Sequence, residues 1–446
     1  MRPISSPPSP QRNMSAVRRK CHDMTVNPLQ FFSEDTQKSH SPALPSNLKY
    51  KNRQLILNCF RDNQEHTVAD IVAQTGISKL TVMRAIQFFC SREILVSAGK
   101  GDSTEQGGKK PEFFRFSQGQ VLLNITMWPS SLNLTLFDMN MTSLAENSYE
   151  WIIPNTAEAA FEYIGQRCLE LLGQNDLTID DLYGVNLSTS GLVDYDHLVL
   201  KYSVHTPEWG NNVPIGQHLR SVFGSKPIFL MENAGKCVSR AALTAVEDPH
   251  RRILVLFTAW GLSGALFENG RILNGRDSLI GEIGHMIQDP SDGEVCGCGS
   301  RGCVEHLVSE AWMRQRIAKN PPPADSLLAK IPAGELTLRR LFAVSQQEDA
   351  YAREQVAYLA DQFAVLIRNI TLVFDPETVI FVGNYALSGP WFEERMRTTL
   401  TKLHYLQSCP PLDIRYDVRS LTKLDALGGA IALMNHFFSD SQLYMD

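Results

Sequence analysis

The sequence predicts an α/β protein that carries a small, mainly helical unit at its N-terminal end. First, strand-like and helix-like segments alternate over roughly 300 residues from residue 119 onward, which is typical of α/β layers around a largely buried sheet. Second, two short helical patterns within residues 46–95 are joined by a turn at Gly76. Third, 446 residues are long for one core and leave room for about three domains.

Residues 46–95 are expected to form helices around a small core. Thr67 is suited to begin the helix VADIVAQT, which stops before Gly76, and Ser78 is suited to begin the next helix, because Ser and Thr side chains cap helix N-termini. Apolar residues that repeat with helical spacing are expected to be buried, and these are Leu55, Ile56, Cys59, Phe60, Leu80, Met83, Ile86 and Phe89.

Two short helices joined by a Gly-containing turn form the pattern of a helix-turn-helix. The segment VSAGKGDSTEQGGKKPEFFRFS then contains two strand patterns around a Gly- and Lys-rich loop, as in a β-hairpin wing. A generic small helical domain is the alternative. DNA contacts are expected from the first turn and outer face of the second helix and from the wing, with a solvated surface role as the alternative for each: Ser78, Lys79, Thr81, Arg84, Lys100, Lys109 and Lys110.

Charge is divided unevenly along the chain. Residues 1–118 contain 17 Lys and Arg against 10 Asp and Glu, and the remaining residues contain 25 against 38, so the two parts carry +7 and −13. A basic front on an acidic body indicates that the front meets a polyanion such as operator DNA; a solvated basic face is the alternative. Because one such domain makes few contacts, we expect a homodimer or homotetramer that binds two half-sites.

The composition is that of an ordinary soluble globular protein, with 43% hydrophobic and 20% charged residues. There is no apolar run of membrane-spanning length and no apolar signal-peptide core near the N-terminus, so a cytoplasmic protein without membrane insertion is expected. Residues 1–45 are rich in Pro, Ser, Asn and Gln and are expected to be a disordered extension.

The stretch GEIGHMIQDPSDGEVCGCGSRGCVEH (281–306) has the composition of a metal site. Three thiolates and one imidazole, from His285, Cys296, Cys298 and Cys303, complete a tetrahedral zinc shell and leave no open position for a catalytic water. We therefore expect one structural Zn²⁺ per chain. Reduced, buried cysteines are the alternative, against which the crowding of the cysteines in a Gly-rich loop argues.

The same stretch resembles the zinc signature of the ROK family, whose repressors and sugar kinases share one fold. Other segments resemble the family in its order: SGLVD (190–194), PEWGNNVPIG (207–216), ENAGKCVSRAAL (232–243), GALFENGRILNG (264–275) and DPETVIFVG (375–383). The resemblance covers residues 46–446 and is to the transcriptional-regulator branch.

The resemblance implies a hexokinase- and actin-like (ribonuclease H-like) ATPase-fold body of two lobes behind a winged helix-turn-helix. The domains expected on this basis are 46–118 for DNA binding, 119–245 with 425–446 for the first lobe, and 246–424 for the second lobe, which holds zinc and the dimer interface. The N-terminal domain is expected to fold by itself.

Residues at the places that the family's kinases use differ in this chain. The family places a catalytic aspartate in an Asn-Asp-Ala-Asn pattern, where this chain has Asn233, and an amide cannot hold the proton of the attacking hydroxyl. Glu232 is adjacent, but neighbouring side chains on an extended segment point to opposite faces. Asn124 and Thr126 replace the Asp-x-Gly of the phosphate-binding hairpin, and Trp260 stands where a Gly-rich turn is expected. We therefore expect no ATP-dependent phosphorylation.

The resemblance also implies contacts to sugar hydroxyls. It places Glu282, His285 and Glu305 at these contacts, and Asn233 can bond a hydroxyl without acting as a base. The sequence thus predicts a transcriptional regulator, a repressor of carbohydrate-related genes, with a sugar or sugar phosphate as effector. The alternatives are a ROK sugar kinase that phosphorylates a hexose or amino sugar with ATP, and a regulator controlled by a protein partner with an empty sugar cleft.

Overall fold

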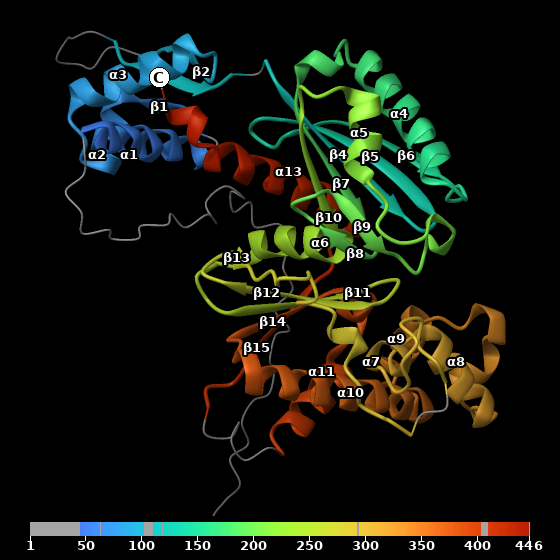
Figure 1. The fold of residues 1–446 in the computed structure, drawn as a ribbon. Helices are drawn as coiled ribbons and strands as arrows, with labels where there is room; N and C mark the ends of the chain where they lie inside the picture. The colour runs from blue at the N-terminus through green and yellow to red at the C-terminus, as the bar shows by residue number, and fades with distance from the viewer. Residues whose placement is uncertain are drawn as a thin grey trace, which may run out of the picture.

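The computed structural model describes residues 45–62, 64–101, 110–117, 119–291, 294–402 and 409–445. It confirms the predicted α/β architecture: the described residues form two five-stranded sheets with helices, and a smaller N-terminal unit. Figure 1 shows this unit beside the first sheet, with the second sheet below. The predicted disorder of residues 1–45 falls outside the described residues except for Pro45, with which the first helix begins.

The N-terminal unit consists of three helices and a small sheet in the order β1-β3-β2. Thr67 caps α2 in a capping box with Asp70, Gly76 ends the helix with a left-handed φ of 68°, and Ser78 caps α3, so the predicted helix boundaries are confirmed. The elements are α1 (Pro45–Asn58), β1 (His66–Thr67), α2 (Val68–Thr75), α3 (Lys79–Ser91), β2 (Leu95–Lys100) and β3 (Glu112–Phe116).

The prediction of which apolar residues are buried in this unit is partly wrong. Leu80 is 58% exposed and Met83 is 40% exposed, and in α1 Leu55 is 37% exposed. The reason is that each residue of an α-helix turns by about 100°, so Leu80 and Met83 lie roughly opposite the stripe that packs inward. That stripe of α3 consists of Val82, Ala85, Ile86 and Phe89.

The first lobe is built on the sheet β10-β7-β4-β5-β6. β4 pairs in parallel with β7 and antiparallel with β5, and its side chains alternate between two covered faces. Apolar residues of β4 on one face pack with the helices α4 and α5. The elements are β4 (Val121–Trp128), β5 (Ser131–Asp138), β6 (Ser143–Glu150), α4 (Ala157–Gln174), β7 (Leu182–Thr189), β8 (Leu192–Asp194), β9 (Val199–Tyr202), α5 (Ile215–Phe223) and β10 (Ile228–Asn233).

The second lobe repeats this strand pattern in the sheet β13-β12-β11-β14-β15. Again a central strand, β11, is antiparallel to its hairpin partner β12 and parallel to β14. The elements are β11 (Ile253–Thr258), β12 (Leu262–Glu268), β13 (Arg271–Ile272), α7 (Val304–Leu307), α8 (Glu310–Lys319), α9 (Leu338–Ser345), α10 (Ala350–Phe374), β14 (Thr378–Gly383), α11 (Pro390–Leu400) and β15 (Asp413–Asp417).

One helix of the described chain, α10, is long and apolar enough to cross a membrane by length and composition alone. Its apolar residues include Phe363 and Ile367, which are fully buried in the core of the second lobe. α10 therefore has the packing of a core helix.

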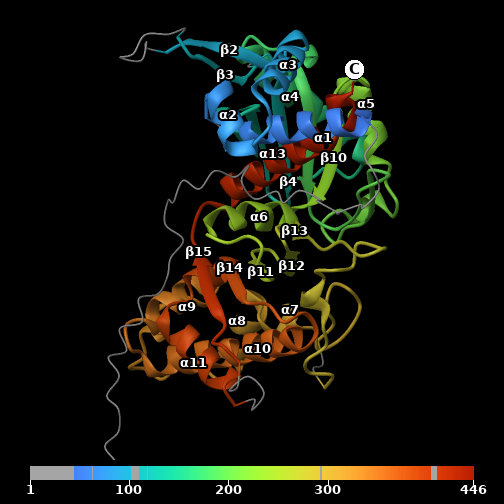
Figure 2. The ribbon, with the colours of Figure 1, turned by 90° about the vertical axis from the view of Figure 1, so that its left-hand side faces the viewer.

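Two helices, α6 (Ala234–Ala242) and α13 (Leu421–Ser439), lie between the two sheets and pack against each other. The approach is close because Gly428 faces the backbone carbonyl of Cys237, where a side chain would collide. Gly429 lies equally close to the Asn124 side chain of β4. α13 thus returns from the second lobe to the first sheet, and Figure 2 shows it running toward the N-terminal unit.

The C-terminal end of α13 completes the core of the N-terminal unit. Phe437 and Phe438 contact Phe116 of β3 with ring centroids 6.1 and 5.9 Å apart, and Tyr444 contacts Phe89 of α3 at 6.4 Å. These residues belong to one buried cluster with α1, α2 and α3. Part of the core of this unit therefore comes from the other end of the chain. That the N-terminal domain folds by itself stays a prediction.

Candidate functional site: a cleft beside a cysteine and histidine cluster

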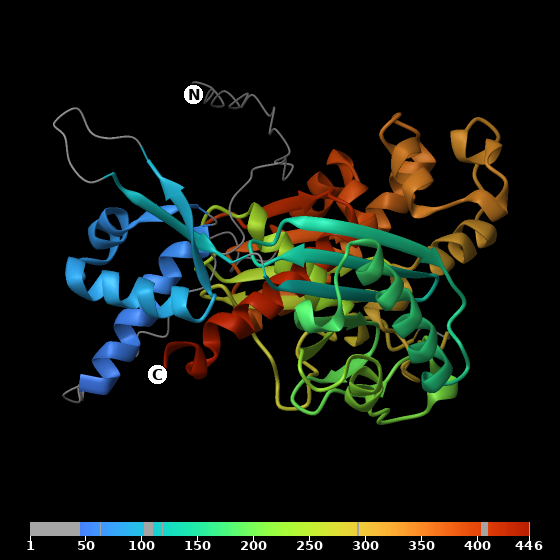
Figure 3. The same cartoon turned by 90° about the horizontal axis from the view of Figure 1, so that it is seen from above.

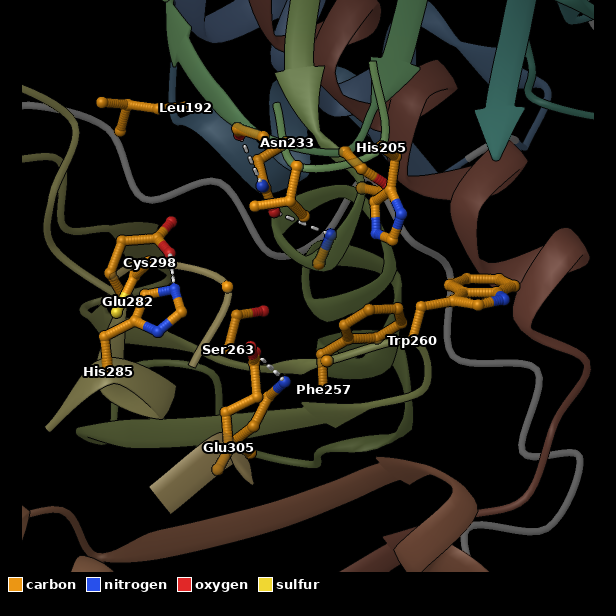
Figure 4. A pocket seen from close by; sticks show the side chains of 18 of the residues that line it. Leu192, His205, Asn233, Phe257, Trp260, Ser263, Glu282, His285, Cys298 and Glu305 are labelled. Carbon is orange, nitrogen blue, oxygen red and sulfur yellow. Dashed lines mark hydrogen bonds and ion pairs between the residues drawn. The ribbon is translucent and has the colours of Figure 1, made fainter. Parts of the chain in front are cut away.

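A cavity of about 440 Å³ lies between the two lobes. It is lined by the segments that follow β7 and β10, by the β11–β12 turn and by residues around the cysteine cluster (Figure 4). The carboxyl ends of parallel strands are the usual place for ligands in α/β sheets. The cavity contains all four residues for which sugar contact is predicted: Asn233, Glu282, His285 and Glu305.

Next to the cavity, His285, Cys296, Cys298 and Cys303 form one cluster whose ligand atoms all lie within 4.8 Å of one another. The Sγ atoms of Cys298 and Cys303 are 3.6 Å apart, and Cys296 Sγ is 3.7 Å from Nδ1 of His285. A tetrahedral Zn²⁺ with Zn–S bonds of about 2.3 Å separates its ligand atoms by about 3.8 Å. The geometry therefore fits a metal ion of this size.

The loop that holds the cluster is shaped by close backbone approach. Gly302, at φ 74°, lies so near the carbonyl of Asp289 that a Cβ would collide with it. Burial raises the pKa of Cys303 to about 12, and the neighbouring thiols add to the rise. A bound cation would deprotonate these thiols. Residues 292 and 293 of the same loop lie outside the described part.

His285 connects the cluster with the cavity. Its Nδ1 faces Cys296, while its Nε2 lies 4.0 Å from a carboxylate oxygen of Glu282. Burial raises the pKa of Glu282. Glu305, at the start of α7, accepts a hydrogen bond of 2.8 Å from the backbone N–H of Leu262, the first residue of β12. Two carboxylates and one imidazole therefore lie at the wall of the cavity, next to the cluster (Figure 4).

Asn233 stands at the end of β10, where it caps α6. Its Oδ1 accepts from the N–H of Gly235 at 2.9 Å, and its Nδ2 donates to the carbonyl of Gly191 at 2.9 Å. Glu232 points the other way and binds Arg240 with both carboxylate oxygens, as the alternation along a strand predicts. An ion-paired carboxylate outside the cavity is not placed to take a proton from a bound hydroxyl.

Asn124 and Thr126 of β4 form hydrogen bonds with Asp425, a buried carboxylate of α13. Thr126 Oγ1 donates to Asp425 at 2.6 Å, Ser188 of β7 donates to the other oxygen at 2.6 Å, and Asn124 lies 3.4 Å away. Burial raises the pKa of Asp425 to about 6. The two residues that replace the expected phosphate-binding motif are thus committed to an internal network.

Two tryptophans meet across the cleft. Trp128 ends β4 in the first lobe and Trp260 lies in the β11–β12 turn of the second, with ring centroids 4.3 Å apart and planes at 56°. In the sequence these positions belong to the two hairpins in which phosphate-binding glycines are expected. The two rings therefore pack together on the hairpins at which the family resemblance implies phosphate contacts.

Two residues at the site were not predicted from the sequence. His205 lines the cavity, and burial lowers its pKa, which favours a neutral ring able both to donate and to accept. Asp425 could have been noticed because it is the one acidic residue of the otherwise apolar segment LDALGGAIALM (424–434). His205 carries no comparable signal in its local sequence.

The residues predicted to contact DNA lie on the N-terminal unit, far from the cavity. Lys79 and Arg84 are exposed on α3, whereas Ser78 and Thr81 join their hydroxyls in the cap at 2.9 Å. Lys100 and Lys110 are exposed at the two described ends of the β2–β3 hairpin, which projects from the unit in Figure 3. Lys109 lies outside the described residues. The DNA contacts themselves stay a prediction.

Comparison with known proteins agrees with the two-lobed fold. The chain is 24% identical over 271 residues to a glucokinase of Thermotoga maritima, covering 60% of this chain and 83% of that one. It is 24% identical over 317 residues to the DNA-binding transcriptional dual regulator NagC of Escherichia coli, covering 70% and 75%. The crystal structure of a ROK family transcriptional regulator, a homologue of the E. coli MLC protein, matches with a TM-score of 0.72 at 16% identity and covers 89% of this chain and 98% of that one.

The fold and the site define a two-lobed α/β protein of a class that includes both sugar kinases and regulators. The ROK family profile matches residues 125–436, and the chain belongs to the ROK family. The resemblance stated from the cysteine signature is therefore confirmed.

Proposed function

We propose that the chain is a cytoplasmic, sequence-specific DNA-binding transcriptional regulator, a repressor of carbohydrate-related genes. In this proposal α2, α3 and the β2–β3 hairpin form a winged helix-turn-helix, and the two-lobed body senses a ligand without phosphorylating it. The protein acts as a homodimer or homotetramer, because one DNA-binding unit makes too few contacts to bind a specific DNA site.

The observation that carries the proposal is the hydrophobic core that the N-terminal unit shares with the C-terminal end of α13, an element of the body. A helix-turn-helix pattern with an αL turn at Gly76 is supported by the caps at Thr67 and Ser78. The core that this unit shares with Phe437 and Phe438 links it to the sensing body. The structural match to a ROK regulator over 89% of the chain, beyond the residues that the family profile covers, favours the same reading.

The absence of kinase activity is supported by what each residue at the places used by the family's kinases contacts in this structure. Asn233 holds backbone groups and cannot act as a base, Asp425 engages the residues of the first phosphate hairpin, and Trp260 packs on Trp128. Loss of a general base alone costs on the order of a hundredfold or more in rate. The negative charge of Asp425 and the two indole rings lie near the hairpins where phosphate contacts are expected, and they make nucleotide binding less favourable.

The metal of the cluster is a structural Zn²⁺ in this proposal. Four good ligands leave no open position, so its role is to hold the loop of residues 285–305 and the orientation of the His285 ring. One ion is bound per chain, and the chemistry that the ion supplies is limited to this bracing.

The effector is an unphosphorylated sugar. Glu282 and Glu305 line the cavity together with aromatic residues such as Phe257 and Trp260, and none of its described lining residues is Lys or Arg. Two carboxylates repel a phosphate, whereas sugar hydroxyls or an amino group satisfy them. A protein partner bound elsewhere, with the cavity empty, is the competing form of the regulator.

Binding to DNA and turnover are tested on the full-length chain. Selection from random duplexes at fixed salt is expected to yield one enriched site with two half-sites. Incubation with ATP and a panel of hexoses and amino sugars is expected to give no ADP above the background without sugar. No enriched DNA site, or measurable sugar-dependent ADP formation, would contradict the proposal.

Ligand class is tested by thermal unfolding with a hexose, a hexosamine and the 6-phosphates of both. A ligand that binds the folded state raises the melting temperature. We expect a rise with at least one unphosphorylated sugar and none with the phosphates, and loss of the rise in Glu282→Gln. Glu268→Gln, at an exposed position of β12, serves as the matched control. A rise with only the phosphates would show that the charge argument is wrong.

A further inference from the structure

The outer face of α3 has an unusual composition. Leu80 and Met83 are large apolar side chains exposed to solvent, at 58% and 40%, on the face opposite the buried stripe. The same face carries Lys79, Arg84 and Gln87, all exposed. Spacing by three, four and seven residues places Leu80, Met83, Arg84 and Gln87 on one side of the helix.

The polar residues of this face are available to a partner. Within the described part of the chain, Lys79, Arg84 and Gln87 make no hydrogen bond or ion pair. By contrast, several arginines of the body, such as Arg240 and Arg395, are paired with carboxylates. Two apolar side chains between unpaired cations form a surface that complements a polyanion with apolar groups in its groove.

The major groove of DNA has this chemistry. Phosphates line its edges, and among the four bases only thymine presents a methyl group there, which apolar side chains contact. We infer that Leu80 and Met83 are base-reading residues that contact the C5-methyl groups of thymines, so that the operator requires thymine at the positions under them. This inference rests on the proposed DNA-binding function and adds to it the identity of the bases that two residues select.

Replacement of thymine by deoxyuridine tests the inference, because it removes the methyl group and preserves base pairing. The full-length protein is used first to select a DNA site from random duplexes. Each thymine of that site is then replaced singly, and the dissociation constant is measured by fluorescence anisotropy at fixed salt. At one or two thymines per half-site we expect binding to weaken about fourfold, the factor expected for one buried methyl-sized group. 5-Bromodeoxyuridine, whose bromine is close to a methyl group in size, is expected to restore binding there.

Two variants assign the contacts. In Leu80→Ala and in Met83→Ala, one sensitive thymine each is expected to become indifferent to deoxyuridine, while the other keeps its effect. The slope of affinity against salt is expected to stay that of the parent protein, since no phosphate contact is lost. Alanine is compatible with an exposed helical position, so α3 is retained. Leu169→Ala, at a 47% exposed position of α4, is the matched control and is expected to change nothing.

Each contrary result has a separate meaning. If a site is selected but no thymine is sensitive to deoxyuridine, or if both variants keep every sensitivity of the parent, the inference is overturned while DNA binding stands. If Leu80→Ala binds DNA as tightly as the parent but loses its oligomeric state in light scattering, the face contacts protein and the inference is also overturned. If no DNA site is selected at all, the proposed function itself fails.

Discussion

Asp425 is a buried carboxylate whose contacts are the side chains of neutral residues, and it determines which group the polar side chains of β4 bond to. Its oxygens accept from Thr126 of β4 and Ser188 of β7, so these two hydroxyl groups bond to α13. The sequence indicates only that Asn124 and Thr126 are not a phosphate motif. Which group they bind follows from a contact 299 residues away along the chain.

Asp425→Asn is expected to change how stability depends on pH. Burial raises the pKa of Asp425 to about 6 from the usual 3.8, so the folded state holds this proton more tightly than the unfolded chain. The stabilisation from protonation is therefore full below pH 3.8 and is lost as the pH rises through about 6, a loss on the order of 3 kcal/mol. The melting temperature of Asp425→Asn relative to the parent should increase between pH 4 and 6 and level off above.

The matched control for this titration is Asp277→Asn, at an exposed position. Its melting temperature should follow that of the parent across the same pH range. A constant difference between Asp425→Asn and the parent at all pH values would show that the carboxylate does not titrate in this window.

Asn233→Asp is expected to restore the chemical group of a base without restoring phosphorylation. The carboxylate oxygen that replaces Nδ2 faces the carbonyl of Gly191 and loses its hydrogen bond, which costs about 1–3 kcal/mol in the free energy of unfolding. The two hairpins where phosphate contacts are expected still carry Trp128, Trp260 and the hydrogen bonds to Asp425. ADP formation with ATP and the sugar panel should remain at background. Turnover by this single variant would mean that the tryptophan pair opens readily for nucleotide.

At the scale of elements, α13 is the connection between the parts. It packs on β4, on β7 and on α6, the helix that Asn233 of the cavity caps. Its last residues are core residues of the N-terminal unit. A movement of one lobe relative to the other can therefore be transmitted to α3 through α13, which is packed against both.

Phe438→Ala tests this connection. Phe438 is 1% exposed and contacts Phe116 of β3, so its truncation leaves a cavity in the shared core at a cost of about 3–5 kcal/mol. We expect faster amide hydrogen exchange in α1, α2 and α3, and weaker DNA binding, with the zinc content of the protein unchanged. Leu372→Ala, on the exposed face of α10, is the control and should affect none of these. Unchanged exchange in α1–α3 would mean that the unit is held without α13.

At the scale of the whole molecule, the cluster of His285, Cys296, Cys298 and Cys303 lies at a wall of the cavity between the lobes. Cys298→Ser, or removal of the metal by a chelator, is expected to lower the melting temperature and to abolish the thermal shift given by a sugar, because His285 and Glu305 lose their positions. Elemental analysis should find one zinc per chain in the parent and less in the variant. Cys59→Ser, outside the cluster, is the control. A sugar-induced shift that survives chelation would place the binding residues elsewhere.

Much of the local structure could be predicted from the sequence. Helix caps at Thr67 and Ser78, the turn at Gly76 and the alternation of strands and helices are set by neighbouring residues, and all are found. The His/Cys spacing and the family signature also identified the cluster and the cavity wall. The burial of Leu80 and Met83 was predicted wrongly, because local spacing alone allowed two apolar stripes on α3.

The sequence by itself determined the fold class, the family, the members of the His/Cys cluster and the absence of an aspartate at residue 233. These properties depend on residue identity and on short-range spacing. The tertiary structure alone decided which face of α3 points outward, that Asp425 binds the first hairpin, that Trp128 meets Trp260, and that the two ends of the chain share one core. Each of these is a contact between segments far apart in sequence, and its energy comes from burial that no local pattern specifies.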